Sequence, residues 1–200
     1  AGGVTSYMDM PNTNPQTTSI EALNNKFEDA AQKSVANYSF YFGATNDNEG
    51  LIPHLDKQRI CGIKLFMGAS TGNMLVDKMD SLKYIFKHAG MLIATHCEDQ
   101  SIINSNIAAY KGKYDEDLPI HYHPLIRDER ACYESSSLAV ALAKETGARL
   151  HFMHISTAKE LELLEDKPIG EKNITAEACV SHLFFSDKDY ERLGARIKCN

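Results

Sequence analysis

Residues 62–96 contain the pattern that decides the fold: Gly62–Met67 reads GIKLFM, Ser81–His88 reads SLKYIFKH, and Met91–His96 reads MLIATH. The first and third segments are short apolar runs with few charges, which is typical of strands buried on both faces of a sheet. The segment between them has the apolar spacing of an amphipathic helix. A strand, a helix and a second strand in this order predict a βαβ unit with parallel strands.

The same alternation extends over the rest of the chain. Further strands are predicted at Val4–Met10, Tyr38–Ala44, Arg149–Ile155, Ile174–Ala178 and Arg196–Cys199. Further helices are predicted at Ser19–Ser34, Asp99–Tyr110, Glu129–Thr146 and Ala158–Leu164. Six or seven such units without an internal linker predict a (β/α)8 barrel of the TIM type. A doubly wound open sheet is the alternative, but Met10–Pro15 follows the first strand, where that fold usually has a glycine-rich phosphate turn.

The length is short for a complete barrel. Such barrels usually take about 250 residues, whereas this chain has 200. Ala1-Gly2-Gly3 runs directly into an apolar strand, and Arg196–Asn200 has the pattern of the middle of a strand. We therefore expect residues 1–200 to form one partial barrel domain, a fragment of a longer chain. It would cover most of the central strands and lack the first and the last.

The composition is that of a globular protein. Hydrophobic residues make up 43% of the chain and charged residues 24%, which is enough apolar material for a sizeable core. The formal net charge of −6 argues against a dedicated nucleic-acid-binding protein, because such a protein normally has a basic patch. No apolar run approaches the roughly eighteen residues of a membrane span. Five cysteines without a CxxC pair favour reduced thiols and hence a cytoplasmic protein.

Candidate functional residues come from the ends of the predicted strands, where barrel enzymes place their chemistry. These residues are Asn12, Lys64, His96, His154, Glu177 and Asn200. The two histidines end consecutive apolar runs in the same way, and neutral imidazole nitrogens are ligands for zinc. A single histidine at a strand end is more often a hydrogen-bonded polar residue, so the pair carries the metal interpretation.

Lys64 lies inside an apolar strand, where a lysine is costly unless it is paired. Burial lowers the pKa of a lysine and makes it a nucleophile. One interpretation is a lysine that has captured carbon dioxide as a carbamate, whose two oxygens bridge two metal ions. The other is a lysine that extends to the rim of the barrel.

Three other features are not interpreted as site residues. His121 and His123 have the spacing of a metal pair but lie in a polar loop flanked by proline. His151 is three residues before His154, and in a strand these two side chains point to opposite faces. Cys97 is next to His96, so in a strand the two point apart.

With these residues placed, the sequence resembles the amidohydrolase superfamily and, within it, the dihydroorotases. The resemblance rests on six segments in the family order: 1–5 with 9–13, 62–67, 95–99, 154–157, 175–178 with 182–183, and 197–200. Gly62–Met67 is similar to the carbamylated-lysine strand of the family. Thr95–Asp99 and His154–Thr157 are similar to its two strands that each carry one histidine ligand.

The resemblance implies a role for each matched residue. Lys64, as a carbamate, would bridge two zinc ions, and His96 and His154 would bind one of them. Asn12 would hold the substrate carboxylate, and Asn200 would contact the substrate near the end of its strand. Some dihydroorotases have aspartate where this chain has Lys64, so the metal arrangement is left as a prediction.

Two elements of the family pattern are not found in residues 1–200. One is the His-x-His of the first strand, which supplies two more metal ligands. The other is the aspartate of the last strand, which binds metal and acts as the general base. We therefore assign no catalytic acid or base within this chain and expect the general-base aspartate beyond Asn200.

The resemblance implies the zinc-dependent, reversible cyclisation of N-carbamoyl-L-aspartate to L-dihydroorotate, a step of de novo pyrimidine biosynthesis. The implied partner is a small-molecule substrate, not a nucleic acid or a membrane, and a homo-oligomer is left open. The alternatives are a dihydropyrimidinase, hydantoinase or allantoinase, and a catalytically inactive dihydroorotase-like scaffold. Met10–Thr13 and His96–Asp99 favour an acidic substrate and hence dihydroorotate.

Overall fold

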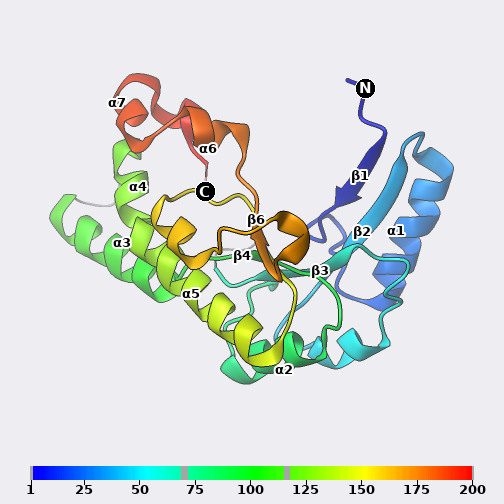
Figure 1. Ribbon diagram of the computed structural model, residues 1–200. Coiled ribbons are helices and arrows are strands. Elements are labelled where there is room, and N and C mark those ends of the chain that lie inside the picture. Colours follow the sequence, from blue (N-terminus) through cyan, green and yellow to red (C-terminus); the bar gives the residue numbers. More distant parts are fainter. Residues whose placement is uncertain (1, 69–71, 115–117, 200) are drawn as a thin grey trace.

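Parallel strands alternate with helices along the chain in the computed structural model, which describes residues 2–68, 72–114 and 118–199 (Figure 1). The strands are β1 (Ser6–Asp9), β2 (Asn37–Gly43), β3 (Gly62–Phe66), β4 (Ile93–His96), β5 (Leu150–Phe152) and β6 (Ile174–Ala176). The α-helices are α1 (Ile20–Lys33), α2 (Met79–His88), α3 (Gln100–Tyr114), α4 (His123–Ile126), α5 (Glu129–Thr146), α6 (Val180–Phe184) and α7 (Tyr190–Leu193).

The six strands form one sheet in the order β1-β2-β3-β4-β5-β6, and each is parallel to the next. Figure 1 shows this sheet as a curved half-barrel, with α1, α2 and α5 on its outer side. Because each strand pairs with the one that follows it in the sequence, every connection returns the chain to the same end of the sheet. All the carboxyl ends therefore lie along one edge. The sequential strand order, which a doubly wound sheet does not have, confirms the predicted barrel class.

Local sequence signals begin and end the two longest outer helices. The Ser19 side chain accepts a hydrogen bond from the Ala22 backbone N–H at the start of α1. Asp128 does the same for Ala131 at the start of α5. Gly147 ends α5 with a φ of 71°, a left-handed conformation that glycine adopts without steric cost.

The core lies between the sheet and the outer helices. Alternate residues of β3 and β5, among them Ile63, Leu65 and Phe152, are buried in it with apolar side chains of α2 and α5. Since successive side chains of a strand point to opposite faces, Lys64 points to the concave face of the sheet. It is in register with Ala94 of β4, and Ala94 is in register with His151 of β5.

The predicted strand at Arg196–Cys199 is wrong. Gly194–Ile197 is a turn of 3-10 helix, and the Lys198 N–H donates to the Ala195 carbonyl 3.2 Å away. A four-residue segment becomes a strand through pairing with a neighbour rather than through its own preference. The predicted helix at Ala158–Leu164 is likewise a 3-10 helix, Lys159–Leu163.

Candidate metal centre and active site

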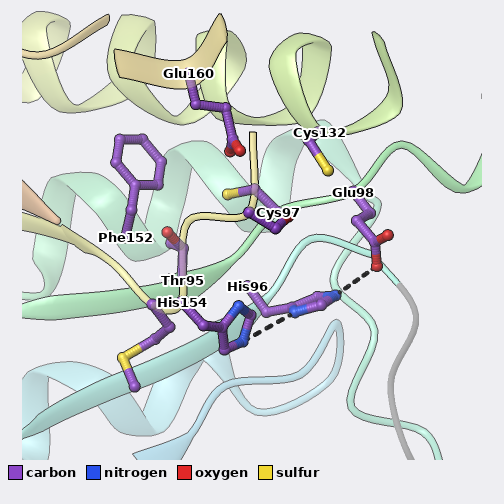
Figure 2. A pocket seen from close by; sticks show the side chains of 10 residues that line it. Thr95, His96, Cys97, Glu98, Cys132, Phe152, His154 and Glu160 are labelled. Carbon is purple, nitrogen blue, oxygen red and sulfur yellow. Dashed lines mark hydrogen bonds and ion pairs between the residues drawn. The ribbon is translucent and has the colours of Figure 1, made fainter. Parts of the chain in front are cut away.

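Two histidines from neighbouring strand ends face each other on the concave side of the sheet. His96 is the last residue of β4, and His154 lies two residues after the end of β5. His96 Nδ1 is 3.3 Å from His154 Nε2 (Figure 2). The structure therefore brings together the pair that the sequence analysis selected.

The backbone of His154 is responsible for this orientation. His154 has a φ of 36°, in the left-handed region that non-glycine residues rarely adopt. The strand has already ended at Phe152, so strict alternation does not apply to His154. A residue held in such a conformation by its surroundings is a feature of functional sites.

Neutral imidazole is favoured at His154. Burial and the neighbouring His96 lower the pKa of His154 to about 4. A neutral ring leaves one nitrogen lone pair free to bind a metal ion. His154 therefore has the protonation state of a metal ligand at neutral pH.

Lys64 is buried in the middle of β3, with 3% of its surface exposed. Its amino group lies 4.2 Å from the centroid of the Phe66 ring and 3.4 Å from the Leu65 carbonyl oxygen. Burial lowers the pKa of Lys64 to about 7. A large fraction of the amine is therefore uncharged at neutral pH, and the uncharged amine is the nucleophilic form.

The other ring nitrogen of His96 is bound by a carboxylate. His96 Nε2 is 2.9 Å from Glu98 Oε2 (Figure 2). Arg127 donates from Nε to Glu98 Oε1 at 2.8 Å and from Nη2 to Oε2. Burial opposes ionisation of Glu98, but these hydrogen bonds and charges outweigh it and lower the pKa of Glu98 to about 2.

A second buried carboxylate holds the loop that follows His154. Glu160 accepts hydrogen bonds from Ser136 Oγ of α5 at 2.6 Å and from Thr157 Oγ1 at 2.9 Å. Glu160 and Glu98 line the same small pocket between the strand ends and α5 (Figure 2). This contact ties the His154 loop to the outer helix.

His151 lies on the same concave side as Lys64, two strands further along the sheet. Its Nδ1 is 2.8 Å from Thr175 Oγ1, and its Nε2 is 3.4 Å from Glu177 Oε2. The expectation that His151 and His154 point to opposite faces is therefore wrong, because the left-handed turn at His154 brings both to the interior side. Glu177, at the carboxyl end of β6, joins this group of side chains.

His182 of α6 is another residue near the pair. Its ring centroid is 6.5 Å from that of His154. Both of its ring nitrogens are buried and have no hydrogen-bond partner in the described part of the chain. Sequence reasoning matched His182 to a family segment but had no signal for its role.

The two predicted substrate-binding residues are placed differently. Asn12 is exposed in the loop between β1 and α1, at the edge where the carboxyl ends of the strands lie. Asn200 lies outside the described residues. Their contacts with a substrate stay predictions.

The features that were set aside are accounted for by other contacts. The His121 ring packs on Tyr122, with 4.4 Å between centroids, whereas His123 Nδ1 is 3.2 Å from the Tyr190 hydroxyl. Burial raises the pKa of Cys97 to about 11, so its thiol is protonated and unreactive at neutral pH.

The nitrogen pair fits a zinc ion. Two nitrogen ligands at 2.0–2.1 Å from a tetrahedral zinc are about 3.3–3.4 Å apart, and His96 Nδ1 and His154 Nε2 are separated by 3.3 Å. His182 is the next histidine ring, with its centroid 6.5 Å from that of His154. Within the described residues, no group of three or more His, Cys, Asp or Glu side chains is arranged to hold a metal ion.

Comparison with known proteins gives one consistent class. An allantoinase of Bacillus velezensis is 31% identical over 206 residues, covering 100% of this chain and 44% of the relative. A dihydroorotase of Methanosarcina mazei is 28% identical and is covered to 45%. No protein-family model matches the chain.

Solved structures agree with these relatives. An L-hydantoinase (dihydropyrimidinase) from Arthrobacter aurescens superimposes with a TM-score of 0.88 at 26% identity, over 98% of this chain and 44% of that chain. The chain thus spans a little under half the length of the proteins that it matches. Its homologues are cyclic amidohydrolases named dihydroorotase, allantoinase and hydantoinase, which confirms the resemblance seen in the sequence.

Proposed function

We propose that the protein to which residues 1–200 belong is a zinc-dependent cyclic amidohydrolase of the dihydroorotase type, acting in the cytoplasm. It would interconvert N-carbamoyl-L-aspartate and L-dihydroorotate. The observation that carries this proposal is the 3.3 Å approach of His96 Nδ1 and His154 Nε2 beside the buried Lys64. The homologous dihydroorotases and hydantoinases support the reaction class.

Lys64 is proposed to supply a bridging ligand. An amine with a pKa near 7 reacts with carbon dioxide in its uncharged form, giving a carbamate and one released proton. The carbamate would carry a negative charge and two oxygens, so it would act as a carboxylate toward two zinc ions. Its position on β3 places it one strand away from His96.

Bound zinc would polarise the scissile carbonyl and lower the pKa of a water molecule toward neutrality. The residues of this chain would do the rest of the positioning. His96 and His154 offer their facing nitrogens, and the amide of Asn12 would donate a hydrogen bond to the substrate carboxylate. The proton that passes to the leaving nitrogen is assigned to an aspartate outside residues 1–200.

Allantoin hydrolysis is the second candidate. It is favoured by the allantoinases among the relatives, one of which is 31% identical. Allantoin is a neutral ureide ring, whereas dihydroorotate carries a carboxylate. Dihydroorotate therefore needs a residue at position 12 that binds a carboxylate, whereas allantoin does not.

The test is a direct assay on the full-length, zinc-loaded protein. Dihydroorotate, carbamoyl-aspartate, dihydrouracil, hydantoin and allantoin are offered separately, with ultraviolet detection of the first two and product analysis for the others. Turnover of dihydroorotate alone supports the proposal, and turnover of a neutral ring replaces its substrate. Absence of turnover with zinc bound would overturn it in favour of the inactive scaffold.

A further inference from the structure

We propose that Glu98 and Arg127 are positioning residues for His96: they fix its imidazole in the tautomer whose Nδ1 lone pair faces His154. The inference deepens the proposed function, on which it rests for the identity of the metal. It starts from the order of contacts in Figure 2, in which His96 lies between His154 on one side and Glu98 on the other.

The donor and acceptor roles follow from chemistry. An ionised carboxylate is an acceptor without a proton to donate, so the 2.9 Å contact between Glu98 Oε2 and His96 Nε2 requires the proton on Nε2. A histidine binds a metal ion through a ring lone pair, and with the proton on Nε2 the only lone pair that His96 can offer is on Nδ1. The lone pair on Nδ1 of His96 then lies on the side of the ring that faces His154 Nε2, 3.3 Å away.

Arg127 keeps Glu98 ionised and oriented. The guanidinium donates to both carboxylate oxygens, a bidentate geometry that lysine does not reproduce. Glu98 is 2% exposed and His96 is 4% exposed, so water does not compete effectively for these contacts. Removal of the arginine would leave a buried, unpaired carboxylate.

The backbone around Arg127 is held in place independently of the site. Asn106 of α3 donates from Nδ2 to the Ile126 carbonyl at 3.0 Å and to Asp128 Oδ2 at 3.1 Å. The Asp99 N–H donates to the Ala131 carbonyl at 2.9 Å, which joins the segment after β4 to the start of α5. These hydrogen bonds hold the backbone of Arg127 in place between α4 and α5.

His96 is therefore oriented for metal binding before a metal ion arrives. Partners that fix the ring orientation and proton position of a metal-binding histidine typically change metal affinity by 10–100-fold when they are removed. Glu98 has this relation to His96, and Arg127 acts through Glu98.

The first measurement needs no variant. In the full-length, metal-free protein with 15N-labelled histidine, NMR reports which ring nitrogen of His96 is protonated, with the resonance assigned by its loss in His96→Gln. A proton on Nε2 is expected. A proton on Nδ1 would overturn the inference.

The second measurement is zinc affinity, determined by competition with a chromophoric chelator. Glu98→Gln removes the charge and leaves the carboxamide free to present either its oxygen or its NH2 group, and the expected loss of affinity is about 10–100-fold. Glu160→Gln is the matched control, because it alters a carboxylate of the same pocket that is bonded to two hydroxyl groups. These hydroxyls can accept as well as donate, so zinc affinity should be unchanged.

A double-variant cycle tests the route through Glu98. Arg127→Met should weaken zinc binding in the wild-type background and have little further effect beside Glu98→Gln. Equal zinc affinities of Glu98→Gln and Glu160→Gln would overturn the inference. A protein without cyclic-amide turnover whose zinc affinity still depends on Glu98 would refute the proposed function and uphold the positioning role.

Discussion

His96 Nδ1 and His154 Nε2 are 3.3 Å apart although the two residues are separated by 58 positions in the chain. Two parallel strands that pair side by side end at the same edge of the sheet, and the left-handed turn at His154 directs its ring back toward β4. This approach gives the site its chemistry.

Lys64→Met should stabilise the metal-free protein and abolish zinc-dependent activity. The folded protein disfavours the charged lysine, whose pKa falls from 10.5 to about 7. Unfolding therefore takes up a proton between about pH 7 and pH 10.5, so the free energy of unfolding of the wild type rises as the pH is raised through this range. Removing this penalty should add on the order of 2–4 kcal/mol near pH 7.

Denaturant unfolding of both proteins at several pH values checks this prediction. The difference in stability between Lys64→Met and the wild type should shrink as the pH approaches 10.5. A variant with full zinc content and unchanged turnover would contradict the carbamate.

His154→Gly and His154→Ala should differ in stability although both lose a zinc ligand. Alanine at a φ of 36° costs about 1 kcal/mol relative to glycine, after allowing for the greater freedom of glycine in the unfolded chain. Thermal unfolding of the two metal-free variants should therefore show the glycine variant melting at the higher temperature. The reverse order would mean that the backbone relaxes out of the left-handed region when the imidazole is removed.

Asn12→Ala should raise the KM for dihydroorotate with no change in zinc content. Losing a hydrogen bond to a charged group costs about 1.5–3 kcal/mol, which corresponds to roughly 10–100-fold. Asn12→Asp should raise the KM further, because a second carboxylate repels the first. Steady-state kinetics of the wild type and the two variants measures this, and an unchanged KM for dihydroorotate would remove the assigned carboxylate contact.

His121→Ala should leave zinc content and activity unchanged. His121 is exposed and packs on Tyr122. Metal analysis after dialysis against dilute zinc is sufficient as a readout. Loss of an ion would show that the His-x-His spacing at 121–123 was misjudged.

The strands could be located in the sequence because burial on both faces leaves a short, nearly continuous apolar run. For β3 the predicted Gly62–Met67 and the observed Gly62–Phe66 differ by one residue. The same approach failed at Arg196–Cys199, where the pattern was short and the hydrogen bonds are made within a turn. It also failed for His151, because alternation was extended beyond the last residue of β5.

The ion pair between Glu98 and Arg127 could not be predicted from residue spacing. They are 29 residues apart, and each has a common residue type in a polar stretch. Their ion pair depends on how α3, α4 and α5 pack behind β4, so no local pattern identifies it.

The sequence by itself determined the alternation of buried strands and amphipathic helices, and with it the strand that carries Lys64 and the strand ends near which His96 and His154 lie. Hydrophobic periodicity and capping residues depend on residues close together in the chain, so they can be recognised in the sequence. The tertiary structure alone decided which nitrogens face each other, which carboxylate holds His96, and how strongly burial lowers the pKa of Lys64. Those properties depend on distances between distant segments and on exclusion of water, and both arise only when the sheet and its helices pack together.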